Sequence, residues 1–360
     1  MSTLRVAVAG ATGVAGQQAL VSLDNHPWFE VVALAASSRS AGKKYTDAIT
    51  APNGALRWAC NEPIPEWAKA MTVQQADEMP LDGIDVLFNA TESDAAKIIE
   101  PRFAEHIPVI STASAFRYEA DVPIYIPGVN LDHVELLRTQ QKNRGWKGFV
   151  IPIPNCTTTG LAVSLAPLVE EFGIEGVAVM SMQALSGGGR SPGVLGLDIL
   201  DNVIPYIPGE EEKVEIETQK ILGAMQNNAI VSANFPVSAT CTRVNVLDGH
   251  TEAVFAGLKK KASVDEVADV MRSFGKELNE MNLPSAPEKV ITVLEDPFHP
   301  QPRVDRDRDG GMTTSVGRIR EDNLLPNGIK YVLVSHNTKA GAAKGATLVA
   351  EVLVSKGYIG

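Results

Sequence analysis

One cysteine occupies a position that favours a reactive thiol. Cys156 lies between an apolar stretch, 148–153, and a stretch of small and apolar residues, 159–168. The first stretch predicts a buried strand and the second predicts the first turns of a helix, so Cys156 falls at their junction. Unpaired backbone N–H groups and the positive end of the helix dipole favour a thiolate there, and a thiolate is a nucleophile near neutral pH. The alternative is a small, buried and inert cysteine.

A strand, a glycine-rich turn and a helix follow one another at the N-terminus. Residues 4–9 alternate as an apolar strand, and a helical stretch runs through Leu23. The turn between them, Gly10–Gly16, has the spacing G-x-x-G-x-x-G. Glycines let the backbone approach a pyrophosphate, which the N-terminus of the next helix holds. The pattern predicts a dinucleotide site, with tight helix packing as the alternative. The expected contacts are Gly10, Thr12, Gly13 and Val14.

The end of the second predicted strand, 30–36, indicates which dinucleotide binds. Ser37, Ser38 and Arg39 follow this strand, and no acidic residue stands where an NAD site usually binds the ribose hydroxyl. Two hydroxyl groups and an arginine, with Lys43 and Lys44 close behind, suit a 2'-phosphate. We therefore predict NADP, while an ordinary polar loop is the alternative.

Strands and helices continue to alternate in the first half of the chain. Apolar strands are expected at 84–90 and 108–112, with a helix at 94–106 between them. This alternation predicts a doubly wound parallel sheet, the Rossmann arrangement. Arg117 lies just beyond a strand, at the edge of such a sheet that binds ligands. A further helix is expected at 130–142, and residues 45–80 show no clear period.

The composition changes after Cys156. Longer strands, expected at 177–185, 239–247 and 252–259, are typical of a mixed sheet. A glycine-rich loop follows Ser186, and a helix opens at 209–213. A final strand, 331–336, leads into a helix of small residues that ends at Val354 and is expected to pack back on the first domain. The predicted domains are 1–155 plus 338–360, and 156–337.

The composition excludes several classes of protein. Apolar residues make up 44% and charged residues 21%, as in an ordinary globular protein. The net charge of −11 would repel nucleic acid. No stretch reaches the roughly 20 apolar residues that a membrane helix needs. The first strand pattern starts at Leu4, without a preceding leader pattern, so a cytoplasmic location is expected.

Neither a disulfide framework nor a metal site is expected. The three cysteines, Cys60, Cys156 and Cys241, are widely spaced, and the six histidines do not cluster at metal-ligand spacing. The acidic string 305–310 resembles the first half of a calcium loop, but Val316 stands where the bidentate glutamate should be. We interpret this string as a solvated loop whose charges pair with one another.

These segments resemble the aspartate-semialdehyde dehydrogenase family over nearly the whole chain, with a spacing most similar to its archaeal and fungal branch. The resemblance is carried by 10–16, 154–160, 183–187, 243–252 and 335–338. It implies an N-terminal Rossmann domain, and an α+β domain with a mixed sheet that carries catalysis and dimerisation. It also implies the reductive dephosphorylation of L-aspartyl 4-phosphate by NADPH to L-aspartate 4-semialdehyde, a step toward lysine, methionine and threonine.

The resemblance also implies a role for each site residue. Cys156 matches the nucleophile, His250 the acid and base, and Gln183 the residue that orients the thiol. Arg243 matches the residue that binds the substrate carboxylate, and Glu210 matches the residue that binds its amino group. The phosphate-binding matches are Arg117, Lys213 and Asn155, and the cofactor-binding matches are Ser186, Gly187 and Asn337. The departures, Thr157, Gly188 and Asn245, remove no reacting group.

Other functions remain open at this stage. A malonyl-CoA reductase shares the fold and the cysteine, but a thioester substrate needs no phosphate-binding residues. Another acyl-phosphate reductase, of the N-acetylglutamyl-phosphate type, is a second alternative, and an NADP-binding scaffold without turnover is a third. The exposed apolar surface of the second domain predicts a homodimer or homotetramer.

Overall fold

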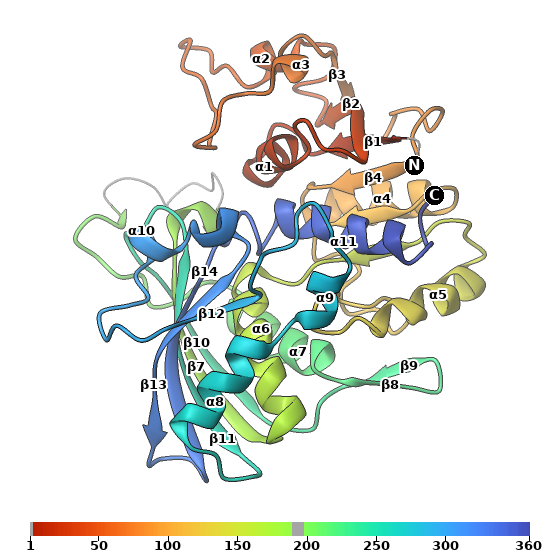
Figure 1. Cartoon of the computed structure of the whole chain (residues 1–360). Coiled ribbons are helices and arrows are strands. Elements are labelled where there is room, and N and C mark those ends of the chain that lie inside the picture. Colours follow the sequence, from red (N-terminus) through yellow and green to blue (C-terminus); the bar gives the residue numbers. More distant parts are fainter. Residues whose placement is uncertain (1–2, 189–197) are drawn as a thin grey trace. The chain divides into compact units, whose positions relative to one another are not determined.

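The computed structural model describes residues 3–188 and 198–360 (Figure 1). The chain divides into two compact units. Unit 1 comprises Met1–Pro123, Val134–Ile153 and Ala342–Gly360. Unit 2 comprises Ile124–His133 and Pro154–Gly341. The last segment of the chain therefore belongs to the same unit as the first.

Unit 1 is built on a parallel sheet of six strands in the order β3-β2-β1-β4-β5-β6. This order is that of a doubly wound dinucleotide-binding sheet, so the predicted Rossmann arrangement is confirmed. Its strands are β1 (Leu4–Ala9), β2 (Phe29–Ala36), β3 (Val73–Gln75), β4 (Val86–Asn89), β5 (Val109–Ser111) and β6 (Val150–Pro152). Most strand residues are buried on both faces, which explains their continuous apolar runs.

Helices connect and cover these strands. They are α1 (Val14–Ser22), α2 (Tyr45–Ala48), α3 (Glu66–Lys69), α4 (Ser93–Ala104), α5 (Leu136–Arg144) and α11 (Ala343–Ser355). Helix α11 packs on α1, where the Ser22 and Thr347 hydroxyls lie 2.8 Å apart. In the turn after α1, His26 Nε2 lies 2.8 Å from a Glu351 oxygen. These contacts fix the end of the chain to its beginning.

The boundaries of some predicted elements differ in the structure. The helix expected at 130–142 starts as a 3-10 turn, η1 (His133–Glu135), before α5 begins. Residues 45–80, which show no clear hydrophobic period, form α2, α3 and β3. These elements are only three or four residues long, too short for a hydrophobic period to develop.

Unit 2 contains a mixed sheet of six strands in the order β10-β7-β11-β14-β13-β12. The outer pairs β10-β7 and β12-β13 are parallel, whereas the three inner pairs are antiparallel. The predicted mixed sheet is confirmed. Its strands are β7 (Ile174–Gln183), β10 (Val237–Arg243), β11 (His250–Leu258), β12 (Ile291–Leu294), β13 (Thr314–Asp322) and β14 (Gly328–Ser335), and a separate hairpin is formed by β8 (Ala224–Gln226) and β9 (Ala229–Val231).

Helices α6 and α8 pack side by side against one face of this sheet (Figure 1). The helical segments are α6 (Cys156–Glu171), α7 (Glu210–Ile221), α8 (Val264–Ser273), α9 (Lys276–Glu280), α10 (Pro302–Asp305), η2 (Leu185–Gly188) and η4 (Arg308–Gly311). In the described part of the chain, no helix has the length and apolar character needed to cross a membrane.

Two boundaries in unit 2 matter for the site. Helix α6 starts at Cys156 itself, three residues earlier than the predicted helix. Strand β10 ends at Arg243, four residues before the predicted end, because its pairing with β7 stops where Arg243 faces Gln183. The chain then turns through Gly249, whose φ of 91° suits glycine, and re-enters the sheet at His250.

Candidate active site

Cys156 is the first residue of α6, and the residue before it caps the helix. The Asn155 side-chain oxygen accepts the backbone N–H groups of Thr157, at 2.8 Å, and Thr158, at 3.3 Å. Cys156 itself is half-buried, so its thiol is accessible at the positive end of a 16-residue helix. The helix therefore stabilises a negative charge on the sulfur, as a nucleophilic thiolate requires.

His250 contacts this sulfur. Its Nε2 atom lies 3.1 Å from Cys156 Sγ, and its Nδ1 atom accepts the backbone N–H of Ala184 at 3.0 Å. Because Nδ1 is an acceptor, the hydrogen of the neutral ring must be on Nε2. The ring therefore approaches the sulfur as a hydrogen-bond donor.

The surroundings of His250 keep it neutral. The pKa of His250 falls to about 3, mainly because the side chain is completely buried and also because the positive charge of Arg243 is near. A second proton would also have to enter at Nδ1, where the Ala184 amide already donates. A thiolate at Cys156 would thus be stabilised by a neutral donor rather than by an imidazolium.

Three predicted site residues are neighbours across the sheet of unit 2. Arg243 on β10 pairs with Gln183 on β7. Thr251 on β11 pairs with Met182 on β7, which sets His250 beside Gln183. All three side chains are buried. The sheet register therefore places the imidazole of His250, the amide of Gln183 and the guanidinium of Arg243 side by side at one edge of three adjacent strands.

Glu210, the first residue of α7, connects two of the predicted site residues. Its Oε1 atom accepts hydrogen bonds from Gln183 Nε2 at 3.0 Å and Asn155 Nδ2 at 2.9 Å. Its Oε2 atom lies 3.7 Å from Lys213 Nζ. Glu210 thereby fixes both amides, and the Asn155 oxygen faces the helix N–H groups.

The Arg243 guanidinium is buried, and few contacts offset the cost of burying its charge. Its Nη1 atom donates to the Ala184 carbonyl at 2.8 Å, and the structure shows no ion pair for it within the described residues. Burial lowers the pKa of Arg243, while the charges of Cys156 and Glu210 raise it. A buried cation of this kind binds a carboxylate strongly, since both of its nitrogen edges can donate.

Two glycines border the reacting groups. A Cβ atom on Gly187 would lie 2.9 Å from His250 Cε1 and 3.0 Å from Arg243 Nη1. A Cβ atom on Gly341 would lie 3.0 Å from the Cβ of Cys156. Because Gly187 and Gly341 have no side chains, space remains next to His250 and next to Cys156.

Ser186 and Asn337, which the resemblance assigns to the cofactor, are bonded to each other. Asn337 Nδ2 donates to the Ser186 hydroxyl at 2.8 Å, and Asn337 Oδ1 accepts the N–H of Gly249 at 2.8 Å. Asn337 thus joins the loop that precedes His250 to the turn that contains Gly187. Gly189, at the end of the predicted glycine-rich loop, lies outside the described residues.

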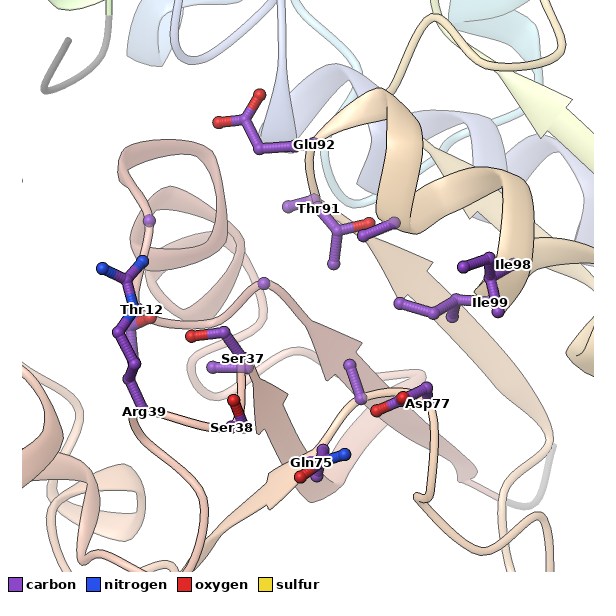
Figure 2. Close-up of a pocket in the computed structure, with 16 residues that line it drawn as sticks. Thr12, Ser37, Ser38, Arg39, Gln75, Asp77, Thr91, Glu92, Ile98 and Ile99 are labelled. Carbon is purple, nitrogen blue, oxygen red and sulfur yellow. The ribbon is translucent and has the colours of Figure 1, made fainter.

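Unit 1 contains a pocket of about 450 Å³ at the carboxyl ends of its strands (Figure 2). Six of the predicted cofactor residues line it: Gly10, Thr12, Gly13, Ser37, Ser38 and Arg39. Val14 does not line this pocket, although it starts α1 beside it. The side chains of Thr12 and Arg39 lie on one side of the pocket, and those of Ile98 and Ile99 lie across from them.

The backbone around this pocket fits a dinucleotide. Gly10 has a φ of 78°, and a Cβ atom there would lie 2.3 Å from the Ala90 carbonyl oxygen. A Cβ atom on Gly16 would lie 2.1 Å from the Gly10 oxygen. Both positions therefore require glycine, and the close turn exposes the N-terminus of α1. Among the described residues Arg39 forms no ion pair, so its charge is available to a 2'-phosphate.

Arg117, predicted to bind phosphate, lies in unit 1 and is buried. Its Nη2 atom donates to the Thr112 carbonyl at 2.9 Å, just beyond the end of β5. Lys213 and Asn155, the other two residues of the predicted phosphate set, lie in unit 2 and both contact Glu210.

The acidic string near residue 305 is used internally. Asp305 accepts hydrogen bonds from the Gln301 amide at 2.6 Å and from Arg308 at 2.7 Å, and Asp307 lies 3.2 Å from Lys339 Nζ. Over residues 3–188 and 198–360, no group of three or more His, Cys, Asp or Glu side chains is arranged to hold a metal ion.

Several residues that shape these sites could not be predicted from local sequence patterns. The Ala184 amide sets the tautomer of His250, and Glu217 accepts the Asn155 N–H at 2.6 Å. Both contacts join residues more than 60 positions apart, and no local pattern signals them. Ile98 lines the nucleotide pocket and is 68% exposed. The sequence offered one indication of this role, because Ile98 is an apolar residue on the polar face of the predicted helix 94–106.

Two family models match the chain. One, described as the NAD binding domain of semialdehyde dehydrogenase, matches residues 5–137. The other, described as the semialdehyde dehydrogenase dimerisation domain, matches residues 165–339. Together they cover nearly all of both sheets, while β6 falls between the two matches.

Relatives match over nearly the full length. The chain is 45% identical to the aspartate-semialdehyde dehydrogenase of Methanothermobacter thermautotrophicus, over 97% of this chain and 99% of the relative. A crystal structure of aspartate semialdehyde dehydrogenase with NADP from Candida albicans superposes with a TM-score of 0.88 at 42% identity, covering 99% of this chain and 100% of that one. A structure of aspartate semialdehyde dehydrogenase II complexed with ASA, from Vibrio cholerae, gives a TM-score of 0.77 at 27% identity, with coverage of 98% and 99%.

Proposed function

The chain belongs to the aspartate-semialdehyde dehydrogenase family, and from this premise we propose how its residues reduce L-aspartyl 4-phosphate to L-aspartate 4-semialdehyde with NADPH. The reaction releases phosphate and leads toward lysine, methionine and threonine. The observation that carries this assignment is the 3.1 Å contact between Cys156 Sγ and His250 Nε2 at the N-terminus of α6. It supplies the nucleophile and its proton partner at one position.

Cys156 is the proposed nucleophile. Its thiolate attacks the acyl carbon of the substrate, the C–O bond to the phosphate breaks, and phosphate leaves as the thioester forms. NADPH, when bound, supplies the hydride that reduces the thioester carbon. The resulting hemithioacetal collapses to the aldehyde and returns the thiolate. The N-terminus of α6 stabilises the negative charge at the start and the end of this cycle.

His250 is the proposed acid and base. Its Nε2–H group donates first to the thiolate and then to the oxygen on which charge develops in the tetrahedral intermediates. Because the Ala184 amide occupies Nδ1, His250 acts on these atoms through its Nε2–H bond, and the cycle from thiolate to thiolate requires no net proton from the ring. The Ala184 amide holds the ring in the orientation that this requires.

Arg243 and Glu210 are the proposed contacts for the substrate's own charges. The buried guanidinium of Arg243 would bind the α-carboxylate with two hydrogen bonds. Glu210 would bind the amino group through Oε2, since Oε1 already accepts two amides. Gln183, which Glu210 fixes, would then orient the thiol and the substrate.

Arg117, Lys213 and Asn155 are the proposed phosphate contacts. Arg117 and Lys213 supply positive charge, and the Asn155 Nδ2 group supplies a donor beside the helix N-terminus. Unit 1 would hold the cofactor, with Arg39, Ser37 and Ser38 at the 2'-phosphate. The remaining proposed cofactor contacts are Gly10, Thr12, Gly13, Val14, Ser186, Gly187 and Asn337.

We propose that a second copy of the chain covers the open face of the sheet in unit 2. The helices α6 and α8 pack on one face, while Met180 on the other face is 44% exposed beside the half-buried Ala253 and Val332. The description of the matching family model as a dimerisation domain supports this assembly. A cytoplasmic location is also proposed, since none of Cys60, Cys156 and Cys241 forms a disulfide, as is usual in a reducing compartment.

A malonyl-CoA reductase or another acyl-phosphate reductase would use the same nucleophile. The acyl-aspartate assignment is favoured by Arg243 and Glu210, which offer opposite charges to the two ends of an amino acid. Phosphate dependence separates acyl phosphates from acyl-CoA substrates.

The assignment is tested in the reverse direction with L-aspartate 4-semialdehyde, phosphate and NADP. We expect NADP reduction that requires phosphate and is abolished by Cys156→Ala, whereas Cys60→Ala retains it. NADPH oxidation with malonyl-CoA, but no reaction with the semialdehyde, would transfer the chain to the acyl-CoA reductases. Inactivity with both substrates would favour a non-catalytic NADP-binding scaffold.

A further inference from the structure

A buried carboxyl group lies behind the ligand-binding edge of unit 1. Glu100 on α4 has no exposed surface, and its Oε1 atom accepts hydrogen bonds from Asn89 Nδ2 at 2.6 Å and from the Ser111 hydroxyl. Asn89 is the last residue of β4, and Ser111 is the last residue of the neighbouring β5. None of the roles proposed above uses Glu100.

One chain of hydrogen bonds leads from Glu100 to the nucleotide pocket. Asn89 Nδ2 donates to Glu100, so the Oδ1 atom of Asn89 faces Thr91. This oxygen accepts a hydrogen bond from the Thr91 hydroxyl at 2.9 Å. Thr91 lines the pocket that also contains Arg39 (Figure 2). Glu100 therefore determines the orientation of the Asn89 amide and, through it, one wall of the pocket.

A second chain of hydrogen bonds leads from Glu100 to Arg117. The Asn89 carbonyl accepts the N–H of Thr112 at 2.9 Å, and the Thr112 carbonyl accepts Arg117 Nη2 at 2.9 Å. The Ser111 hydroxyl also accepts the N–H of Ala113 at 3.0 Å. The segment that carries Arg117 is thus connected to Glu100 on both sides of Thr112.

Electrostatic interaction adds to these contacts. Arg117 is only 5% exposed, and its positive charge acts on Glu100. Burial outweighs the hydrogen bonds from Ser111 and Asn89 and the Arg117 charge, and it raises the pKa of Glu100 to about 7. The Oε2 atom of Glu100 has no hydrogen-bond partner among the described residues, which leaves a position for a proton.

The other groups packed around Glu100 do not replace Arg117 in this role. Asn89 of β4 and Ser111 of β5 are uncharged, and β6 carries no titratable residue. Helix α11, which packs against β5, carries Glu351, whose carboxylate contacts His26, and Lys344. Arg117 is the cation whose charge lowers the pKa of Glu100.

We propose that Glu100 is a positioning residue for the anion site at Arg117, and that binding of a phosphate group to Arg117 is coupled to the uptake of one proton by Glu100. The inference rests on the proposed function, which assigns phosphate to Arg117. A bound dianion offsets the Arg117 charge, so the ionised carboxylate loses its stabilising cation. A proton from the buffer then adds to the Glu100 carboxylate, and no other bond changes. By reciprocity, ionisation of Glu100 at higher pH weakens phosphate binding.

The test uses sulfate as the probe, because its charge does not change near neutral pH whereas that of inorganic phosphate does. Sulfate binding to the NADP-saturated protein is measured by titration calorimetry in pairs of buffers with different ionisation heats, from about pH 6 to about pH 8. For the unmodified chain we expect proton uptake that increases toward the upper end of this range, and sulfate binding about tenfold weaker there. Glu100→Gln should bind sulfate without proton uptake and with a flat pH profile. Glu105→Gln, an exposed change at the end of the same helix, should behave as the unmodified chain.

Further variants distinguish the phosphate role of Arg117 from its coupling to Glu100. Ser111→Ala removes a donor to the ionised carboxylate, so the proton uptake should shift to higher pH. Arg117→Leu should abolish sulfate binding; if binding persists, both the phosphate role of Arg117 and the coupling are wrong. If binding depends on Arg117 but Glu100→Gln takes up as many protons as the unmodified chain, the coupling alone is overturned and the proposed function stands.

Discussion

The Nε2 atom of His250 lies 3.1 Å from the Sγ atom of Cys156. The opposite nitrogen of the ring is occupied by the Ala184 amide, so the hydrogen is held on the side that faces the sulfur. A neutral donor and a helix N-terminus together stabilise the thiolate, while the complete burial of His250 disfavours an imidazolium. This geometry favours a thiolate at Cys156 without an imidazolium beside it, and the Arg243 charge adds to that stabilisation.

We expect Cys156 to react with iodoacetamide at least about tenfold faster than Cys60 or Cys241 at neutral pH. Burial raises the pKa of the Cys241 thiol to about 12, and Cys60 does not begin a helix. His250→Asn should slow the alkylation of Cys156 and leave that of Cys60 unchanged. Peptide mass spectrometry over a time course measures the three rates together. Equal rates at Cys156 and Cys60 would contradict an activated nucleophile.

Gly187→Ala should reduce turnover without unfolding the chain. The new Cβ atom would lie 2.9 Å from His250 Cε1 and 3.0 Å from Arg243 Nη1, so the ring, the guanidinium or the substrate must move. A displacement of this size lowers kcat/KM by about 100-fold. Gly187 is exposed, so the melting temperature should remain unchanged. Unaltered kinetics would show that the substrate does not use the space beside these two groups.

Arg39→Ala should weaken NADP binding while leaving NAD binding almost unchanged. Loss of hydrogen bonds to a charged phosphate costs about 1.5–3 kcal/mol, or roughly 10- to 100-fold in affinity. Fluorescence titration with each nucleotide measures the difference. Lys43→Ala is a matched control, because Lys43 is exposed nearby and does not line the pocket. A similar loss for both nucleotides would argue against a 2'-phosphate at Arg39.

Glu100→Gln should change how stability depends on pH. The folded-state pKa of Glu100 is raised to about 7, so its protonated form stabilises the fold at low pH. This contribution is complete below the unfolded pKa near 4.5 and is lost as the pH rises through about 7. As the pH rises between these limits, the free energy of unfolding of the variant should therefore increase by about 3 kcal/mol relative to that of the unmodified chain. Urea unfolding at several pH values measures this difference, and a constant difference would indicate that Glu100 stays ionised.

Local sequence determined the parts of the protein that depend on neighbouring residues. The strand 4–9 and the glycine turn Gly10–Gly16 are adjacent in the sequence, so their pattern alone predicts a nucleotide turn. Asn155 and Cys156 are likewise adjacent, and their pattern predicts a nucleophile at a helix N-terminus. The alternation of strands and helices likewise specified the parallel sheet of unit 1. Short elements in 45–80 escaped detection because they have too few residues to show a period.

The tertiary structure alone decided how the reacting groups meet. His250 lies 94 positions from Cys156 in the chain, and only the register of β11 beside β7 sets it in the row with Gln183 and Arg243. The tautomer of His250 follows from a backbone amide 66 positions away. Glu100 appeared in the sequence as one residue of a predicted helix, and its burial between Asn89, Ser111 and Arg117 exists only in the folded sheet. Spacing along a chain specifies local backbone geometry, whereas hydrogen bonds and charges act across the distances that folding creates.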